Sequence, residues 1–157
     1  MSLKNATTVL ATACALFALY LGLSFVLAPE ASTRGVGLPA WPAGNGDGYL
    51  VMKGTRELAM GLATGVLLVT GHRRALGWVL LAEAVAPFGD MVNVLAHHGS
   101  GAAAFGIHGL TAALIAITGL LILRETGKAD PGHPGHPGHT AHTCHEAAVP
   151  APGAQPA

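Results

Sequence analysis

Hydrophobic residues gather in four long stretches of the chain, and polar residues separate these stretches. The stretches are residues 6–27, 49–70, 75–96 and 102–123. Each has about the 20 residues that an α-helix needs to cross a hydrocarbon core about 30 Å thick. The pattern therefore predicts an all-α fold, a bundle of four transmembrane helices in a domain of residues 1–125. We expect the first stretch to be retained as a helix, because it is longer than the apolar core of a secretory signal.

The segments between the stretches predict how the helices are connected. Residues 29–48 hold prolines and a glycine-rich cluster, which form turns, so we expect one long loop there. Residues 71–74 and 97–101 are short enough to be tight turns. The last three helices are therefore expected to be consecutive antiparallel neighbours.

Small residues four positions apart are the expected contacts between helices. Lipid gives helices no hydrophobic reason to associate, so close approach of the backbones must supply the contact energy. Two pairs have this spacing: Gly61 with Gly65, and Ala102 with Gly106.

The composition agrees with a lipid-embedded protein. Hydrophobic residues make up 51% of the chain and charged residues 10%, which is far from an ordinary soluble composition. The formal net charge is zero with neutral histidines, so nothing in it indicates nucleic acid as a partner. Cys14 and Cys144 lie far apart and predict no disulfide framework. The lipid bilayer is the expected partner, and the sequence leaves open whether the protein forms an oligomer.

Lysine and arginine residues are distributed unevenly between the two ends of the predicted helices. One side has only Arg34, in the long loop. The other side has five such residues: Lys4, Arg73, Arg74, Arg124 and Lys128. Positive residues favour the cytoplasmic side of a membrane. We therefore expect a multi-pass protein of the plasma membrane with both termini in the cytoplasm and the long loop outside.

Ionisable residues inside the predicted helices are the candidate functional group. Each would cost about 2.5–3.5 kcal/mol at the bilayer centre unless it faces a partner or a wet cavity. At about 1.5 Å per residue, those of the last three helices lie at one depth, about 10 Å below the outer helix ends. The candidate ligand-binding residues are Lys53, Arg56, Glu57, Asp90 and His108. Their common depth predicts a single site.

Helical periodicity supports this convergence. Spacings of three and four residues place five side chains of the second helix on one stripe: Lys53, Arg56, Glu57, Met60 and Thr64. Glu83 and Asp90 recur seven residues apart on one face of the third helix. Pro87 lies one turn before Asp90, where it is expected to kink the helix and free a backbone carbonyl toward a cavity.

Glu83 is expected to stand outside this site. It lies about 21 Å from the outer side by the same count, near the cytoplasmic interface. There we expect it to pair with Arg73 or Arg74, or to reach the lipid headgroups.

Two interpretations of the ionisable group remain open. In the first, Arg56 pairs with Asp90. Lys53 pairs with Glu57, and the network only fixes the register of the helices. In the second, the same residues line an outward-facing pocket in which a carboxylate or His108 transfers protons or binds a polar ligand. We favour the second, because so small a protein needs fewer ionisable groups to set its register.

Short motifs in the second and third stretches resemble a known family. They are the sequence Lys-Gly-Thr-Arg-Glu-Leu at residues 53–58, the following Gly61, and the pair Gly89 and Asp90. These motifs resemble the small four-helix integral membrane proteins of the domain of unknown function 4267, over roughly residues 6–123. That family usually has Asp where this chain has Glu57, which keeps the acid. The resemblance implies membrane residence and a four-helix fold, and it implies no settled activity.

Residues 126–157 differ abruptly from the rest of the chain. They are rich in proline, glycine, alanine and histidine and have no apolar periodicity, so we expect a disordered tail. Histidines recur there at every third position, which would place them on one side of a polyproline II helix. They are His133, His136, His139, His142 and His145. Imidazole suits Zn, Ni and Cu, so weak binding of these ions is expected, and no cofactor is expected to be required.

The sequence supports three function classes. The first, slightly preferred, is a small membrane protein of unknown activity whose outward-facing intramembrane pocket binds a small molecule. The second is a membrane-embedded isomerase, cyclase or hydrolase in which Asp90 or Glu57 acts as acid or base, while Arg56 and His108 polarise the substrate. The third is a structural or accessory subunit, or a metal-handling protein that acts through its tail. The predicted helices contain no nucleophile motif or phosphate loop, so whether the protein is an enzyme stays open.

Overall fold

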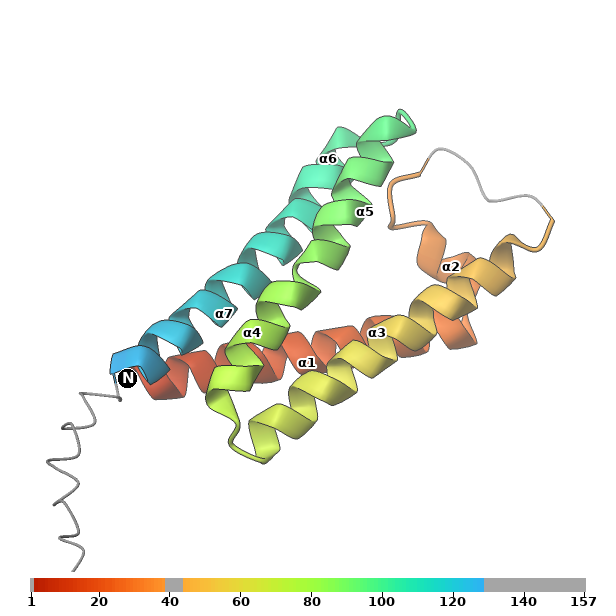
Figure 1. Cartoon of the computed structure of the whole chain (residues 1–157). Coiled ribbons are helices and arrows are strands. Elements are labelled where there is room, and N and C mark those ends of the chain that lie inside the picture. Colours follow the sequence, from red (N-terminus) through yellow and green to blue (C-terminus); the bar gives the residue numbers. More distant parts are fainter. Residues whose placement is uncertain (1, 39–43, 129–157) are drawn as a thin grey trace, which may run out of the picture.

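The computed structural model describes residues 2–38 and 44–128 of the chain. Every regular element within these ranges is a helix, which confirms the predicted all-α fold. The tail histidines that were predicted to bind metal lie outside the described residues. The helices (Figure 1) are α1 Leu3–Leu27, α2 Pro29–Thr33, α3 Gly46–Val69, α4 Arg73–Glu83, α5 Val85–Ala96, α6 Gly101–Ala103, the π-helical segment η1 Ala104–Gly109, and α7 Leu110–Lys128.

Four helical rods correspond to the four apolar stretches of the sequence. α4 and α5 follow each other as one rod, and α6, η1 and α7 form another. Within the described residues, three rods are long and apolar enough to cross a membrane: α1, α4–α5 and α6–α7. α3 is 24 residues long, but it carries Lys53, Arg56 and Glu57 in its first half and is therefore less apolar.

The connection between α1 and α3 begins with the short helix α2, which the prediction of a loop over residues 29–48 missed. Pro29 opens α2, where its missing N–H costs nothing, and Glu30 lies in the first turn, where a negative charge is favourable. The chain after α2 then crosses the molecule. The carbonyl of Gly37 accepts a hydrogen bond from the amide of Ser100 at 2.8 Å, next to the start of α6.

The rod of α4 and α5 is interrupted at Ala84. This interruption agrees with the kink that Pro87 predicted. Pro87 has no amide hydrogen and its ring clashes with the carbonyl four residues earlier, which belongs to Glu83. The regular helix accordingly ends at Glu83 and restarts at Val85. The interruption lies one turn before the proline, close to the acidic residues of this rod.

The rods associate as two closely packed pairs. α1 packs on α3, and this is the first pair; α4–α5 packs on α6–α7, and this is the second pair. A Cβ atom added at Gly54 would lie 2.8 Å from the carbonyl oxygen of Gly22, and one at Gly119 would lie 2.8 Å from that of Gly77. Backbones can come this close only where side chains are missing.

The predicted small-residue pairs do not make these contacts as pairs. Gly61 does pack against α1, where an added Cβ would lie 3.0 Å from the carbonyl of Ala15. Added Cβ atoms at Gly65 and Gly106, in contrast, would meet nothing within 4 Å among the described residues. A spacing of seven, from Gly54 to Gly61, lies along the contact of two nearly antiparallel helices, whereas Gly65 lies beyond it.

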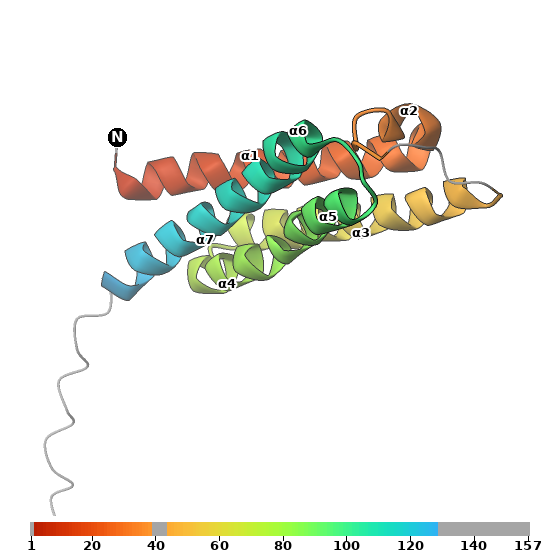
Figure 2. The ribbon, with the colours of Figure 1, turned by 90° about the horizontal axis from the view of Figure 1, so that it is seen from above.

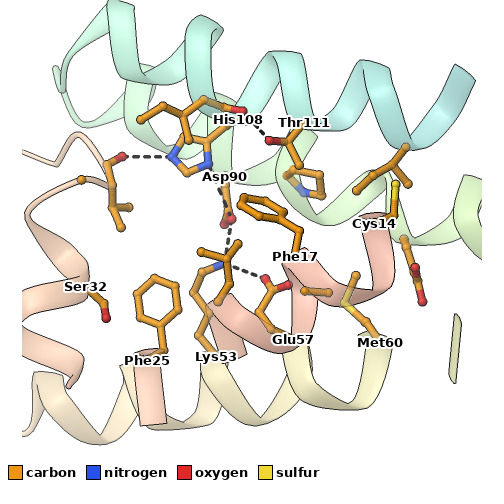
Figure 3. A pocket seen from close by; sticks show the side chains of 18 residues that line it. Cys14, Phe17, Phe25, Ser32, Lys53, Glu57, Met60, Asp90, His108 and Thr111 are labelled. Atoms are coloured by element: carbon orange, nitrogen blue, oxygen red, sulfur yellow. Dashed lines mark hydrogen bonds and ion pairs between the residues drawn. The ribbon is translucent and has the colours of Figure 1, made fainter. Parts of the chain in front are cut away.

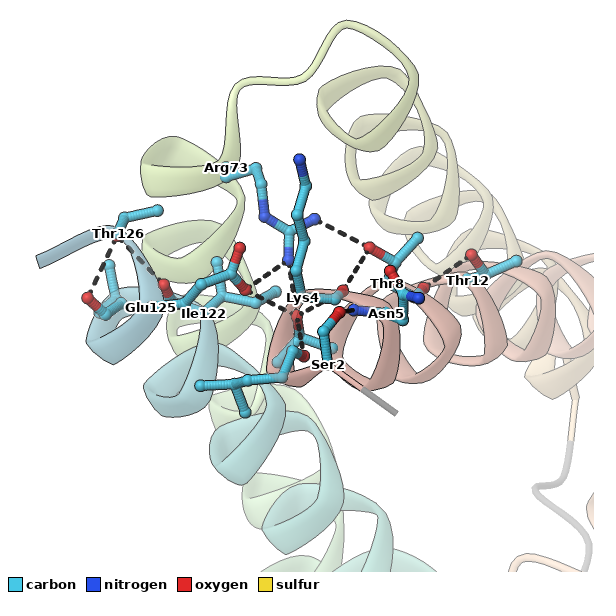
Figure 4. Close-up of polar contacts among 12 residues, drawn as sticks. Ser2, Lys4, Asn5, Thr8, Thr12, Arg73, Ile122, Glu125 and Thr126 are labelled. Atoms are coloured by element: carbon cyan, nitrogen blue, oxygen red, sulfur yellow. Dashed lines mark hydrogen bonds and ion pairs between the residues drawn. The ribbon is translucent and has the colours of Figure 1, made fainter. Parts of the chain in front are cut away.

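The two pairs converge at one end of the bundle and diverge toward the other (Figures 1 and 2). The N-terminal end of α1 and the C-terminal end of α7 lie at the convergent end, and α2 lies at the divergent end. At the convergent end, Arg73 of α4 forms an ion pair of 2.8 Å with Glu125 of α7 and donates a hydrogen bond of 3.0 Å to Thr8 of α1 (Figure 4). These contacts join the two helix pairs at the convergent end. Toward the divergent end the pairs are separated by a pocket.

Candidate functional site: a pocket between the helix pairs

A pocket of about 270 Å³ occupies the space between the diverging pairs (Figure 3). We call it the central pocket. Both helix pairs contribute to its wall, and the segment after α2, with Gly35 and Val36, lines it from the divergent end. Phe17, Met60 and Ile115 belong to its apolar surface. The central pocket is therefore an amphiphilic space between the two helix pairs.

Lys53 organises the polar part of the central pocket. Its ammonium nitrogen lies 2.7 Å from Asp90 Oδ2 on α5 and 3.2 Å from Glu57 Oε1, one turn further along α3. The same nitrogen lies 5.7 Å from the centre of the Phe25 ring on α1, within the range of a cation–π interaction. One cation thus joins three helices, and the structure brings Lys53, Glu57 and Asp90 together as the common depth predicted.

His108 lies beside this network with its two ring nitrogens in different surroundings. Nε2 lies 3.0 Å from the carbonyl oxygen of Val36, and Nδ1 lies 3.9 Å from Asp90 Oδ2. A carbonyl oxygen can only accept a hydrogen bond, so Nε2 carries a proton and Nδ1 is the nitrogen that can gain or lose one toward the pocket. The tautomer is fixed by a backbone group of the segment after α2.

The π-helical segment η1 positions this histidine. A π-helix inserts an extra residue per turn, and such segments frequently occur at functional sites. His108 is buried, 8% exposed, at the end of η1. The sequence pattern did not predict η1, because one extra residue in an apolar stretch leaves no mark in its composition.

The predicted partnership of Arg56 with Asp90 is wrong. Arg56 is exposed and lies outside the pocket lining, and Lys53 takes its place beside Asp90. At about 100° per residue, Lys53, Glu57 and Met60 fall within about 60° of one another, whereas Arg56 lies about 60° from Lys53 on the far side of this stripe. Arg56 therefore shares the depth of the site, but it lies at the edge of the predicted stripe and is exposed.

The prediction that Glu83 stands outside the site is also wrong. Glu83 lines the central pocket, and its carboxylate accepts hydrogen bonds of 3.0 and 2.8 Å from the hydroxyl of Thr64. Arg73, one of the two arginines expected as its partner, pairs with Glu125 instead. Thr64 continues the stripe of Lys53 along α3, so Glu83 lies at the inner end of the pocket, toward the point where the pairs converge.

The residues that the sequence analysis did not single out come mainly from α1 and from the segment after α2. Cys14, Phe17 and Phe25 line the pocket from α1. They recur at helical spacing on one face, but every face of α1 is apolar, so this face carried no distinguishing signal. The role of Val36 depends on its backbone carbonyl, which no side-chain pattern reveals.

Metal ligands do not gather in the described part of the chain. No group of three or more His, Cys, Asp or Glu side chains arranged to hold an ion is found among residues 2–38 and 44–128. Asp90 and His108 are adjacent, but Lys53 occupies the space beside the same carboxylate.

One comparison with known proteins identifies a family. The sequence model described as Domain of unknown function (DUF4267) matches residues 15–122. This range includes Lys53, Glu57, Asp90 and His108, and the match confirms the family that the short motifs resemble. No curated protein and no solved structure is significantly similar to the chain.

Proposed function

The chain belongs to the DUF4267 family, and we propose that it is a small membrane protein whose central pocket binds a small amphiphilic molecule. The observation that carries the proposal is the pairing of two unlike surfaces in one pocket. Charged groups around Lys53 meet apolar groups around Phe17 and Ile115 within about 270 Å³. Such a pocket, mostly apolar with a few convergent polar groups, is typical of small-molecule sites.

The alternative, in which the ionisable residues only fix the register of the helices, explains the polar groups less well than ligand binding does. A pair that only fixes the register of helices would be closed against its neighbours, because open space around charges in lipid is costly. Here the side chains of Lys53 and Asp90 keep 28% and 32% of their surface exposed, and both line the pocket. This exposure supports a role in contacting a ligand.

The binding test uses three compounds that share a phenylalkyl body and differ in the charge of their head group: 4-phenylbutyltrimethylammonium, 4-phenylbutanol and 4-phenylbutanoate. We expect at least one of them to raise the melting temperature of the purified protein in detergent, because a ligand that binds only the folded state stabilises it. In Ala18→Phe, a new ring fills the pocket that Ala18 lines, and the stabilisation should disappear.

The matched control is Ala63→Phe, which adds the same ring on an exposed face of α3. It should respond to the compounds as the unmodified protein does. Failure of all three compounds to stabilise the protein, or equal stabilisation of Ala18→Phe, would refute the proposal.

A membrane-embedded isomerase, cyclase or hydrolase is the second candidate. It is supported by the arrangement of His108, whose Nε2 is held by Val36 while Nδ1 remains free to exchange a proton beside Asp90. The probe is 4-phenyl-2-butanone in deuterium oxide, whose hydrogens next to the carbonyl exchange when a base removes them. Exchange that is accelerated by the protein and lost in His108→Gln would favour catalysis; exchange at the solvent rate with both proteins would count against it.

The membrane topology is the third part of the proposal. We place α3 across the membrane together with the three more apolar rods, with the pocket facing outward and both termini in the cytoplasm of a plasma membrane. The excess of positive residues at the convergent end supports this orientation. Reporter fusions after Lys128 and within residues 35–48 should give cytoplasmic and external signals, respectively. An external signal from the first fusion would reverse the orientation.

A further inference from the structure

When its carboxyl groups are ionised, the charges of the central pocket do not balance. Three carboxylates line it, those of Glu57, Glu83 and Asp90, and among the described lining residues one ammonium group, that of Lys53, faces them. Lys53 is bonded to both Glu57 and Asp90. Even with a proton on both nitrogens of His108, the cations would number two against three carboxylates.

Glu83 is the carboxylate that this network leaves without a cation among the described residues. Its two oxygens receive hydrogen bonds from the neutral hydroxyl of Thr64. Thr64 lies eleven residues, or roughly 16 Å, along α3 from Lys53, so the Lys53 ammonium does not reach it. An anion with a neutral partner in a low-dielectric setting is costly, and a positive charge beside it relieves that cost.

The surroundings of Glu83 suit an organic cation rather than a hydrated ion. Met60 lies one turn before Thr64 along the stripe, and Phe17, Ile115 and Cys14 line the same pocket. An apolar body can lie against these side chains, and aromatic rings such as that of Phe17 attract cations over their faces. A small metal ion would find too few oxygen ligands here, since the described residues hold no group of three candidate ligands.

We propose that the central pocket selects a monovalent organic cation with an apolar body, and that Glu83 supplies the counter-charge at its inner end. The inference rests on the proposed binding function and names its ligand class. The cation contacts the carboxylate that Thr64 orients, while the apolar body fills the space between the helix pairs. The network of Lys53 with Glu57 and Asp90 lines the other end and needs no rearrangement for the ligand to bind.

The phenylbutyl compounds test this selectivity by titration of the purified protein. The cation 4-phenylbutyltrimethylammonium should bind about tenfold tighter than 4-phenylbutanol, equal to about 1.4 kcal/mol, and 4-phenylbutanoate should bind weakest. In Glu83→Gln, which keeps the shape of the side chain, the preference for the cation should fall to about that for the alcohol. The control Glu30→Gln removes an exposed carboxylate of α2 outside the central pocket and should keep the full preference.

A measurement on the unmodified protein keeps the test independent of the folding of Glu83→Gln. The apolar reagent dicyclohexylcarbodiimide adds to carboxyl groups in apolar surroundings, and mass spectrometry of peptides locates the adduct. The cation should protect Glu83 from this reagent, and the alcohol at equal occupancy should protect it less. Equal or tighter binding of the alcohol or of the butanoate would overturn the selectivity and leave the proposed binding function standing, whereas binding of none of the compounds would overturn both.

Discussion

Lys53 holds the polar end of the central pocket together, because its ammonium group lies within hydrogen-bond distance of carboxylates from two helices. Asp90 is at 2.7 Å and Glu57 at 3.2 Å. Removing the ammonium would leave two facing anions in a setting of low dielectric constant. The loss should therefore exceed that of a surface ion pair, which is usually worth about 0–1 kcal/mol.

We expect Lys53→Met to lower the free energy of unfolding by about 2–3 kcal/mol. A fully buried pair would lose about 3–5 kcal/mol, but the Lys53 and Asp90 side chains are 28% and 32% exposed. The double variant Lys53→Met with Asp90→Leu should recover part of the loss, since it leaves fewer unpaired charges. Denaturation in mixed detergent micelles measures each value.

Arg56→Met is the matched control for this cycle. Arg56 is exposed and outside the pocket lining, so its replacement should change the stability by no more than about 0.5 kcal/mol. A larger loss for Arg56→Met than for Lys53→Met would show that Arg56 is the partner of Asp90 after all.

The sequence predicted individual residues of the site where their position along the helix, counted from its outer end, was sufficient to place them. Depth along the helices brought Lys53, Glu57 and Asp90 to one level, and the structure joins them. Helical spacing placed Arg56 on the same stripe, but the structure shows it exposed and outside the pocket lining. Glu83 was missed for the opposite reason: it shares a face with Asp90, but the pocket extends inward beyond the level at which the sequence analysis placed the site.

At the scale of elements, the first helix pair depends on glycines that let backbones approach. An added Cβ at Gly54 would lie 2.8 Å from the carbonyl of Gly22 and 2.8 Å from Phe25 Cβ. Gly54→Ala should therefore push α1 from α3 and cost about 1–3 kcal/mol of stability. Thermal unfolding in detergent would measure it.

Gly65→Ala is the control on the same helix. An added Cβ there would meet nothing within 4 Å, and alanine is a better helix former than glycine by up to about 1 kcal/mol. The variant should be as stable as the original protein or more so. If Gly65→Ala were the more damaging change, the pairing of α1 with α3 along Gly54 would be wrong.

The elements were predictable where apolar length decides and not where the backbone deviates. The four rods begin and end within a few residues of the apolar stretches, because about 20 apolar residues can be buried in lipid only as a helix. The sequence did not predict α2, because the prolines and glycines of residues 29–48 indicated a loop. The sequence did not predict η1, because the position of a π-helical turn depends on its packing against α5. No local sequence pattern indicates this packing.

At the scale of the whole molecule, contacts around Arg73 join the two helix pairs at one end, and the central pocket separates them at the other. The described helices end at Lys128, and the family match ends at residue 122. The bundle thus comprises the segment that the family shares, and residues 129–157 lie beyond it.

Deletion of residues 129–157 should leave the folded bundle intact and remove metal binding. The tail carries five histidines at three-residue spacing, a set that suits Zn, Ni and Cu. The truncated protein should keep its melting temperature and pass through an immobilised Ni column that retains the full chain. If the column retained the truncated protein, the prediction would be wrong, and His97, His98 and His108 would be the candidate metal ligands.

The most direct test of the central pocket is the reactivity of Cys14, which lines it from α1. In a Cys144→Ser background, Cys14 is the remaining thiol of the chain, and 2-aminoethyl methanethiosulfonate should convert it to a mixed disulfide at a rate that mass spectrometry follows. A saturating amount of the phenylbutyl compound that stabilises the protein most should slow this reaction, and Ala18→Phe should slow it without any compound. A rate that neither the compound nor Ala18→Phe changes would contradict the existence of a ligand pocket between the helix pairs.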